Sequence, residues 1–401
     1  MLDHAQCRRQ YAAPMTQPSI PIRQTIADIP TSAIRQIATI GMQMDDVIPF
    51  WFGEPDSPTP DFITEAGAKA LREGKTYYTL NRGIVELRAA LASYMDGLYG
   101  REFDVERVTV TASAMNAIAV AMQCLIDPGD NVVMVAPLWP NIAACAVIMG
   151  GEVREVPLEE QEGRWSLDLD RLFDTIDDRT RVMLVNTPSN PAGWVMSRDE
   201  QLAVLEFCRD RDIWVVADEV YDRIVYDRPH APSFLEVADP DDLLIRISSF
   251  SKSWAMTGWR LGWITAPAAF GPVIEKMTEF NIANAPSVAQ YAGITALAEG
   301  EPFIRETVER YRAARDLSFQ RLGAMPRVRL SLPDGAFYYF FAVDGMSDSL
   351  SFAEQLLRET HVGLAPGSAF GPVGEGRLRL CFASSLDTLS EAFDRIEPHL
   401  S

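Results

Sequence analysis

The segment LLIRISSFSKSWAMTGWRLGWITAP, residues 243–267, sets Lys252 and Arg260 between two apolar runs. The flanking runs, LLIRI and LGWITAP, are short, apolar and β-branched, as buried strands are. A lysine is costly to bury, so its position directly after a strand needs a physical reason. The segment therefore predicts either a solvated loop or a binding site at the carboxyl end of a strand.

The same alternation of apolar runs and helical stretches extends along the chain from about residue 105. The runs RVTVT, NVVMVAP, RVMLVNTP and IWVVADEVY alternate with helical stretches such as ASAMNAIAVAMQCLI. Continuous apolar strands separated by helices predict an α/β fold, in which a mostly parallel sheet is covered on both faces. Ligands bind at the carboxyl ends of such strands. We therefore expect the functional site at the ends TASAMN, APLWP, NTPSNPAG, ADEVY and SSFSK.

The last third of the chain has a different pattern. A charged helical stretch from Pro302 to about Leu322 precedes GAFYYFFAV, SFAEQLLRET and RLRLCFA, which together predict a smaller α+β domain. We expect an N-terminal arm and part of the small domain in residues 1–68, a large domain in 69–300, and the small domain in 301–401. The residues up to about Ser19 are expected to form an arm or a disordered tail.

Composition narrows the function. The chain has 401 residues and a formal net charge of −20, which argues against a nucleic-acid partner. No early segment resembles a secretory signal, and none is apolar over the roughly 20 residues of a membrane span. We therefore expect a cytoplasmic protein without a membrane partner. Its five cysteines include no CxxC pair and its four histidines no HxxxH pair, which argues against a disulfide framework or a protein-bound metal.

The strand ends supply the groups of an anion site. Ser249, Ser251 and Arg260 provide hydroxyl and guanidinium donors, while Ser113 and Ala114 open a helix after RVTVT. Backbone amides at a helix N-terminus beside an arginine are suited to a phosphate. Taken alone, Ser113 is more typical of a plain helix N-cap.

Other strand-end residues are suited to binding the aromatic ring of a ligand. Asp218 ends an apolar strand, where a carboxylate needs a protonated ring nitrogen or a structural arginine as partner. Asn190 and Tyr221 are suited to a phenolate oxygen, although Asn before Pro is also a common turn former. Trp139 would stack on an aromatic ring or simply pack in the core.

Lys252 completes this set of groups. In a desolvated cleft beside Arg260, its ammonium form is disfavoured, so a free amine becomes available to attack an aldehyde. A phosphate, a pyridinium, a phenolate and an aldehyde together describe pyridoxal phosphate held as a Schiff base.

With these residues in place, the chain resembles the class I/II aminotransferases, which are fold type I pyridoxal-phosphate enzymes of amino acid metabolism. The resemblance runs from about Ile34 to Ala383 and rests on FGEPD, YYTLNRGIVELR, TPSNPAG, ADEVY, SFSKSWAMTGWRLGW and RLCFA. It implies a large domain with a mostly parallel seven-stranded sheet between helices, plus a smaller α+β domain. It also implies a homodimer with shared active sites.

The resemblance assigns roles to individual residues. Lys252 would form the Schiff base and later move protons, and Asp218 would pair with the pyridinium nitrogen. The other implied cofactor contacts are Asn190 and Tyr221 at the ring hydroxyl, Trp139 on the ring, and Ser249, Arg260, Ser113 and the amides of Ala114 and Met115 at the phosphate. Tyr78 resembles the tyrosine that reaches the phosphate of the neighbouring subunit. Arg379 resembles the arginine that binds the substrate α-carboxylate, with Gly53, Asn190 and Trp139 nearby.

Two positions depart from the family pattern. Ser113 stands where the family usually has glycine, and Met115 stands where a hydroxyl or a lysine is common. In addition, the segment IPFWFGEPD is unusually aromatic before Gly53.

The implied reaction is ping-pong transamination between an L-amino acid and a 2-oxo acid. Trp51, Phe52 and Tyr339 are candidates for an apolar pocket, and no second arginine matches a side-chain carboxylate site, which favours an aromatic or large apolar donor. The same aromatic residues would also suit a domain interface.

Three alternative functions remain at this stage. A carbon–sulfur β-lyase would use the same cofactor chemistry. A non-catalytic cofactor-sensing regulator would need a DNA-binding domain, and the segment before Ile34 carries no helix-turn-helix pattern. A nucleotide-binding reductase is disfavoured because RVTVT leads into ASAMNA and not into GxGxxG.

Overall fold

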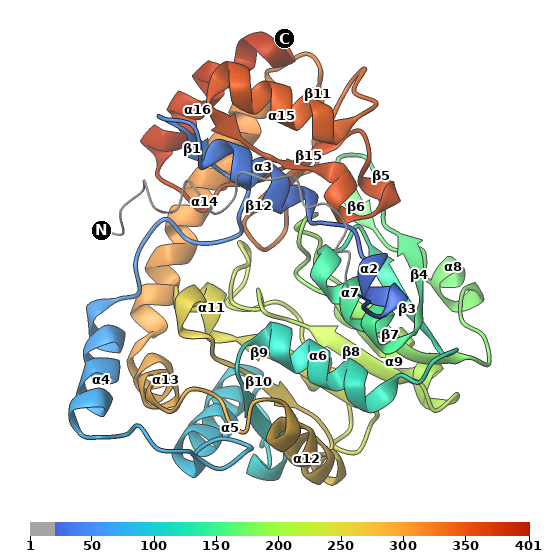
Figure 1. Ribbon diagram of the computed structural model, residues 1–401, viewed down its shortest axis with the longest axis vertical. Coiled ribbons are helices and arrows are strands. Elements are labelled where there is room, and N and C mark those ends of the chain that lie inside the picture. Colours follow the sequence, from blue (N-terminus) through green and yellow to red (C-terminus); the bar gives the residue numbers. More distant parts are fainter. Residues whose placement is uncertain (1–20) are drawn as a thin grey trace.

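The computed structural model describes residues 21–401 (Figure 1). The expected arm up to Ser19 lies outside these residues. Within residues 21–401, no helix combines the length and the apolar composition needed to cross a lipid bilayer.

A seven-stranded sheet forms the centre of the larger part. Its strands are β2 (Val108–Thr111), β3 (Asn131–Ala136), β4 (Glu152–Pro157), β7 (Thr180–Asn186), β8 (Trp214–Asp218), β9 (Leu244–Ser249) and β10 (Gly262–Thr265). They lie in the order β2-β10-β9-β8-β7-β3-β4, and β10 alone runs antiparallel to its neighbours. The predicted α/β fold with a mostly parallel sheet is therefore confirmed.

Helices cover both faces of this sheet. One face carries α6 (Ala114–Leu125), α7 (Pro140–Met149) and α12 (Gly271–Asn281), and the other carries α4 (Asp61–Arg72), α5 (Val85–Tyr99), α9 (Arg198–Arg209) and α13 (Ser287–Glu299). Successive residues of β3 divide between the two cores, with Val132 and Met134 in one and Val133 and Val135 in the other. This two-sided burial explains why the strands are apolar throughout.

The smaller part is built on a second sheet, with the strands β11 (Val328–Arg329), β12 (Tyr338–Val343), β15 (Arg377–Cys381) and β14 (Ala365–Pro366). Helices α3 (Ala33–Gly41), α15 (Ser349–Thr360) and α16 (Leu386–Leu400) gather around it at one end of the molecule (Figure 1). The pair β1 (Ile48–Pro49) and β13 (Val362–Gly363) ties the segment before residue 60 to this part.

Helix α14 (Glu301–Gly323) runs from the neighbourhood of α13 into the smaller part (Figure 1). Its start coincides with the expected boundary at residue 301, whereas residue 68 lies inside α4, which packs against α13. The three expected domain ranges stay predictions. The remaining short elements are α2 (Gln24–Ala27), β5 (Glu159–Gln161), β6 (Arg164–Ser166), α8 (Leu169–Asp174), α10 (Phe234–Val237) and α11 (Phe250–Ser253).

Candidate active site

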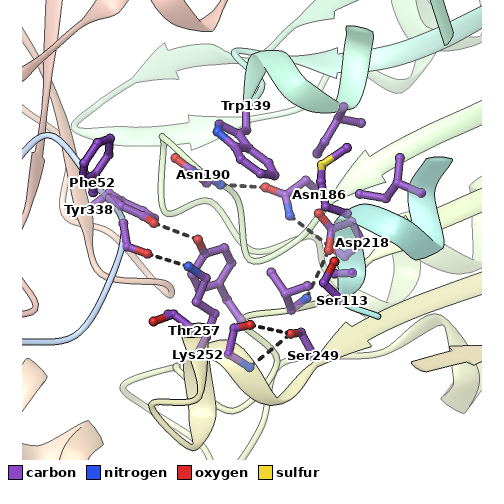
Figure 2. A pocket seen from close by; sticks show the side chains of 18 of the residues that line it. Phe52, Ser113, Trp139, Asn186, Asn190, Asp218, Ser249, Lys252, Thr257 and Tyr338 are labelled. Carbon is purple, nitrogen blue, oxygen red and sulfur yellow. Dashed lines mark hydrogen bonds between the residues drawn. The ribbon is translucent and has the colours of Figure 1, made fainter. Parts of the chain in front are cut away.

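A cleft with an empty volume of about 870 Å³ opens at the carboxyl ends of the sheet strands (Figure 2). Of the residues singled out in the sequence for the site or its apolar pocket, those that line it are Trp51, Phe52, Gly53, Ser113, Ala114, Met115, Trp139, Asn190, Asp218, Tyr221, Ser249, Ser251, Lys252, Arg260 and Arg379. The strand-end residues lie together as the strand-end argument predicts, and Gly53 and Arg379, which only the resemblance had assigned to the site, join them from the smaller part.

Lys252 lies in the short helix α11, whose N-cap is Ser249. Its Nζ donates a hydrogen bond to the carbonyl oxygen of Gly53 at 2.5 Å and lies 5.7 Å from the centre of the Tyr221 ring. The pKa of Lys252 is lowered to about 8, chiefly by burial. Arg379 and Arg260 contribute to this lowering, and Cys381 and Glu54 oppose it. A neutral amine is therefore within reach near neutral pH.

Asp218 ends β8 with only 4% of its surface exposed. One carboxylate oxygen accepts a weak hydrogen bond from the Val220 N–H at 3.4 Å. Burial raises the pKa of Asp218 to about 7, although the Val220 amide and Lys252 lower it. Within residues 21–401, no lysine, arginine or histidine nitrogen lies within 4.0 Å of this carboxylate. A protonated ring nitrogen in the cleft would supply the missing partner.

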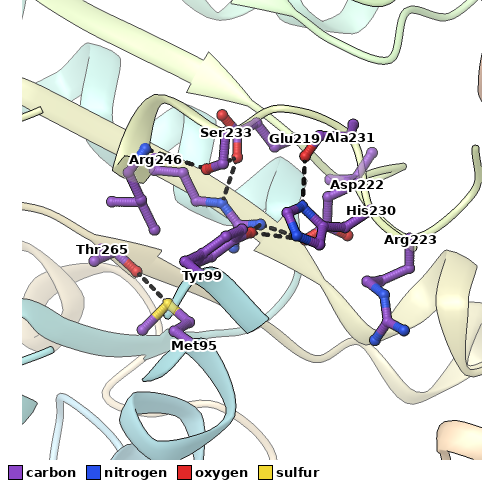
Figure 3. Close-up of polar contacts among 12 residues, drawn as sticks. Met95, Tyr99, Glu219, Asp222, Arg223, His230, Ala231, Ser233, Arg246 and Thr265 are labelled. Carbon is purple, nitrogen blue, oxygen red and sulfur yellow. Dashed lines mark hydrogen bonds and ion pairs between the residues drawn. The ribbon is translucent and has the colours of Figure 1, made fainter. Parts of the chain in front are cut away.

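The next residue, Glu219, has the opposite surroundings (Figure 3). It does not line the cleft, and its carboxylate pairs with Arg246 Nε at 2.9 Å and accepts a hydrogen bond from Ser233 Oγ at 2.6 Å. Arg246 also pairs with Asp222 and donates to the Tyr99 hydroxyl at 3.0 Å. This buried cluster anchors the end of β8 to β9. The sequence analysis missed it, although ADEVYD and LLIRIS place charged residues in otherwise apolar strands.

The N-terminus of α6 forms one side of the cleft. Ser113 caps this helix through its side chain, and Ala114 and Met115 are the first two helical residues, whose N–H groups have no acceptor within the helix. A Cβ atom on Gly262 would lie 2.8 Å from the Ala114 nitrogen, so β10 reaches this helix end only because residue 262 is glycine. Such an N-terminus attracts an anion.

Hydroxyl and guanidinium groups face the same region. Ser249 Oγ lies 2.9 Å from Ser251 Oγ and 3.1 Å from the Leu261 carbonyl oxygen, and its one hydroxyl proton can be donated to either of them. Arg260 donates to the Thr257 carbonyl at 2.7 Å and has no carboxylate within 4.0 Å among the residues described. These donors and the α6 amides fit a phosphate group.

Two tyrosines meet where the larger and the smaller part of the molecule adjoin. The hydroxyls of Tyr221 and Tyr338 lie 2.7 Å apart, and a Cβ atom on Gly53 would lie 1.8 Å from the Tyr338 hydroxyl. Gly53 is thus needed for this close approach. Tyr338 lines the cleft but was not predicted. Tyr339, which the sequence offered either for an apolar pocket or for a domain interface, does not line the cleft. Adjacent residues of β12 point to opposite faces, so the Tyr339 hydroxyl donates instead to the Arg315 carbonyl at 2.9 Å.

Arg379, on β15, is a buried cation with 2% of its surface exposed. It donates to Asn190 Oδ1 at 2.8 Å and to the Trp51 carbonyl, while its Nε has no partner. No carboxylate of the described chain lies within 4.0 Å of its guanidinium. A guanidinium with neutral acceptors and a free donor is suited to the carboxylate of a substrate.

Asn186 is a further cleft residue that the sequence analysis missed. Its side chain accepts from the Asn190 N–H at 2.7 Å and donates to the Asp218 carbonyl at 3.1 Å. It therefore ties the Arg379 side of the cleft to the Asp218 side. Asn186 is the last residue of β7, and this place at the carboxyl end of a strand could have identified it as a site residue.

Tyr78 does not line the cleft of its own chain, and 89% of its surface is exposed. Its predicted role requires a second subunit and stays a prediction.

Together these groups fit pyridoxal phosphate. The cleft offers an amine for the aldehyde, an unpaired buried carboxylate for the ring nitrogen, and an anion site at the α6 N-terminus. Trp139 lines the same cleft and supplies an aromatic surface for the ring.

Comparisons with known proteins agree with this chemistry. The family model for aminotransferase class I and II matches residues 45–396. An aspartate aminotransferase of Pyrococcus horikoshii is 36% identical over 383 residues, which cover 94% of this chain and 97% of the relative. An aromatic-amino-acid aminotransferase of Thermococcus litoralis is 33% identical, over 91% of this chain and 95% of the relative.

The same holds for solved structures. The fold superposes on an aspartate aminotransferase of Thermotoga maritima with a TM-score of 0.88 at 33% identity, covering 94% of this chain and 100% of that chain. The chain belongs to the class I and II aminotransferase family, whose members transfer amino groups with pyridoxal phosphate as cofactor.

Proposed function

We propose that this aminotransferase prefers an aromatic or other large apolar L-amino acid as donor and passes the amino group to a 2-oxo acid by a ping-pong mechanism. The observation that carries the proposal is the make-up of the cleft wall. Ile34, Trp51 and Phe52 line it, and its only cations among residues 21–401 are Lys252, Arg260 and Arg379. All three are assigned to the cofactor or to the α-carboxylate, so among residues 21–401 of the same chain no cleft cation remains for a side-chain carboxylate.

The relatives do not decide the donor. Those that resemble the chain are named for aspartate as well as for aromatic amino acids, at similar identity. The proposal therefore rests on the lining of the cleft.

In this proposal each residue has a physical task. When bound, pyridoxal phosphate supplies an electron sink that makes the substrate Cα–H bond acidic. Lys252 Nζ accepts and returns that proton, because its lowered pKa keeps a share of the amine neutral. Asp218 keeps the ring nitrogen protonated by its charge, and Arg379 orients the substrate through its carboxylate. Trp51 and Phe52 exclude water from the reacting atoms.

The test is a panel of donors with 2-oxoglutarate as acceptor, scored by kcat/KM. We expect phenylalanine, tyrosine and leucine to exceed aspartate by about 10-fold or more, the difference that one well-filled apolar pocket provides. Phe52→Ala should lower kcat/KM for phenylalanine by about 10-fold and leave the value for alanine nearly unchanged. A panel in which aspartate clearly outpaces phenylalanine, tyrosine and leucine would overturn the proposed preference.

The same panel addresses the β-lyase alternative. Transamination requires a 2-oxo acid and yields a new one, whereas a β-lyase releases ammonia and pyruvate from cystathionine without any acceptor. If ammonia and pyruvate were released from cystathionine faster than the enzyme transaminates, the β-lyase function would replace the proposed one.

We also propose a homodimer with shared active sites. Tyr77, Tyr78 and Leu80 form an exposed apolar segment, which is unusual for a surface that meets only water. A mixture of Lys252→Ala and Tyr78→Ala chains tests the sharing, because a mixed dimer contains one site with both native residues only if Tyr78 serves the partner. The mixture should then exceed the mean activity of the two variants, and a strictly additive result would contradict shared sites.

A further inference from the structure

Arg377 lies on β15 two residues before Arg379, so the side chains of the two arginines leave the same face of the strand. Arg379 lines the cleft, whereas Arg377 does not. The guanidinium of Arg377 is held instead by the hairpin formed by β5 and β6, which follows β4 in the larger part and lies beside the smaller part (Figure 1). A contact outside the cleft therefore acts on the strand that carries the substrate-binding arginine.

The hairpin holds Arg377 from two sides. Glu160 and Trp165 lie directly opposite each other in β5 and β6, so their side chains share one face of the hairpin. Arg377 Nη2 pairs with Glu160 Oε2 at 2.6 Å, and its guanidinium carbon lies 4.6 Å from the centre of the Trp165 ring. Ser331 Oγ, of the smaller part, donates to the other Glu160 oxygen at 2.5 Å. The Arg377 and Glu160 side chains are only 15% and 18% exposed, so water screens this pair less than an exposed ion pair.

The hairpin depends on this contact with the smaller part. Among residues 21–401, β5 and β6 pair with no strand other than each other, and a two-stranded hairpin is at most marginally stable alone. Its two turn residues, Glu162 and Gly163, both have positive φ, as in a tight hairpin turn. Trp165 packs against the core of the seven-stranded sheet and against the core of the smaller part. The hairpin is therefore a short projection of the larger part that is anchored on the smaller one.

A row of packed side chains continues from this contact to Arg379. The centre of the Phe340 ring lies 6.4 Å from that of Trp165 and 5.6 Å from that of Phe370. Arg377 also donates to the Phe340 carbonyl at 3.3 Å, and Phe340 lies directly opposite Arg379 in the pairing of β12 with β15. The Phe370 ring in turn lies 4.9 Å from the guanidinium carbon of Arg379. A displacement of Arg377 therefore reaches Arg379 through both the strand and the aromatic rings.

We propose that Arg377 is a positioning residue for the substrate-carboxylate site. The hairpin fixes Arg377 relative to the larger part and thereby sets where β15 holds the Arg379 guanidinium. This placement matters because Arg379 belongs to the smaller part, while Asn190, to which it donates at 2.8 Å, belongs to the larger part. The inference rests on the proposed function only through the role of Arg379 toward the α-carboxylate, and it does not depend on which donor is preferred.

The first test removes the charge of Glu160 but keeps the size of its side chain. In Glu160→Gln, KM for the best donor of the panel should rise by about 5- to 10-fold, because a misplaced Arg379 loses part of its contact with the carboxylate. Lys252 and Asp218 are held by the larger part, so kcat at saturating donor should change by less than about 2-fold.

A double-mutant cycle tests whether the pair acts as one unit. Arg377→Met should raise KM as much as Glu160→Gln does, and the double variant should raise it no further, because either substitution alone already releases the contact. Arg164→Met is the matched control, since Arg164 lies on the same hairpin and pairs with Asp334 of the smaller part at 3.5 Å, but on the exposed surface. This control should keep the native KM.

Cofactor affinity and stability are measured on the same full-length proteins, by absorbance titration with pyridoxal phosphate and by thermal unfolding. The Kd for pyridoxal phosphate should be native in every variant, because the groups that fit the cofactor lie at the strand ends of the larger part. A raised KM in both single variants, with no further rise in the double variant and a native Kd, supports the proposal.

Other results overturn it. A lower melting temperature with a native KM in both single variants would make the contact purely structural. KM increases that multiply in the double variant, or that come with an equal loss of cofactor affinity, would also contradict positioning. The role of Arg379 can fail separately: a native KM in Arg379→Met removes the substrate-carboxylate site itself, whereas a raised KM in Arg379→Met beside a native KM in Arg377→Met removes only the positioning role.

Discussion

Asp218 and Glu219 are adjacent acidic residues at the end of β8, and both are buried, yet their surroundings differ completely. Glu219 pairs with Arg246 on the side away from the cleft, whereas Asp218 faces the cleft with no cation within 4.0 Å among residues 21–401. A buried charge without a partner is unfavourable unless something outside the chain provides one. The contrast separates a charge that holds the fold from a charge that awaits a ligand.

Two buried arginines show the same difference. Arg246 has Glu219 and Asp222 as partners, whereas Arg379 has an amide oxygen, a backbone carbonyl and a free Nε. The first therefore balances charge within the protein, and the second is left to balance the charge of a substrate.

The largest effect is expected for Lys252, the cation of the cleft that also acts chemically. In Lys252→Ala, the rate of transamination should fall by about 10⁴-fold or more, because nucleophile and proton carrier are lost together. Lys276, which is exposed on α12, provides the matched control, and Lys276→Ala should keep the native rate. Initial rates with saturating cofactor measure the effect. A cofactor adduct that borohydride still fixes to the Lys252→Ala protein would contradict the assignment.

The next largest loss of activity is expected at Asp218, and Glu219 provides the comparison. Asp218→Asn should lower kcat by about 10²- to 10³-fold, because a neutral side chain no longer keeps the ring nitrogen protonated. The free energy of unfolding of its cofactor-free form should not fall, because no ion pair of the described chain is broken. Glu219→Gln should show the reverse, with a loss of about 3 kcal/mol in unfolding free energy, because Arg246 is left without one of its partners.

Urea unfolding and steady-state kinetics, measured on the same preparations, separate these two outcomes. If both variants lost activity and stability in equal proportion, Asp218 and Glu219 would belong to one structural unit and the distinction between them would be wrong.

The two arginines should differ in the same way, with a smaller effect on catalysis. Arg379→Met should raise KM for the amino acid by about 100-fold, because a bidentate contact to the carboxylate is lost. Arg246→Met should instead lower the free energy of unfolding by about 3–5 kcal/mol, since two buried carboxylates lose their cation. Arg379→Lys distinguishes charge from geometry: a KM between those of Arg379→Met and the native protein indicates that the planar fork matters. A native KM in Arg379→Met would remove the substrate-binding role.

The sequence predicts the residues that face the cleft better than it predicts the buried ion pairs that hold the fold. Asp218, Ser249 and Lys252 follow apolar strands directly, so their place at one edge of the sheet follows from the fold class. The Glu219–Arg246 pair joins two strands whose neighbour relationship is set by the sheet order, which the apolar runs do not reveal. The apolar runs also do not reveal strand direction, so the antiparallel direction of β10 could not be predicted from its residues.

The errors also have physical causes. Strand β12, YYFFAV, is buried on both faces, so no alternation of polar and apolar residues shows that Tyr338 faces the cleft and Tyr339 does not. Strand β4 lies at the sheet edge and contains Glu152, Arg154 and Glu155, so it lacks the apolar run by which the other strands were recognised.

The last expected effect concerns stability alone, because Asp218 makes the stability of the cofactor-free protein depend on pH. Burial raises the pKa of Asp218 to about 7 in the folded state, against about 3.9 in an unfolded chain. Between these values the folded protein binds a proton that the unfolded protein does not. The stabilising contribution is therefore complete below about pH 4 and is lost as the pH rises through about 7, with a slope of up to about 1.4 kcal/mol per pH unit.

Burial also raises the pKa of Glu219, so the slope has to be measured as a difference between the native protein and Asp218→Asn. The native protein should lose stability relative to the variant between about pH 4 and 7, in urea unfolding at a series of pH values. Adding pyridoxal phosphate should abolish the difference, because a protonated ring nitrogen stabilises the ionised carboxylate and lowers its pKa. Parallel curves for both cofactor-free proteins would show that Asp218 is ionised in the empty cleft, and that the chain itself supplies a partner for its charge.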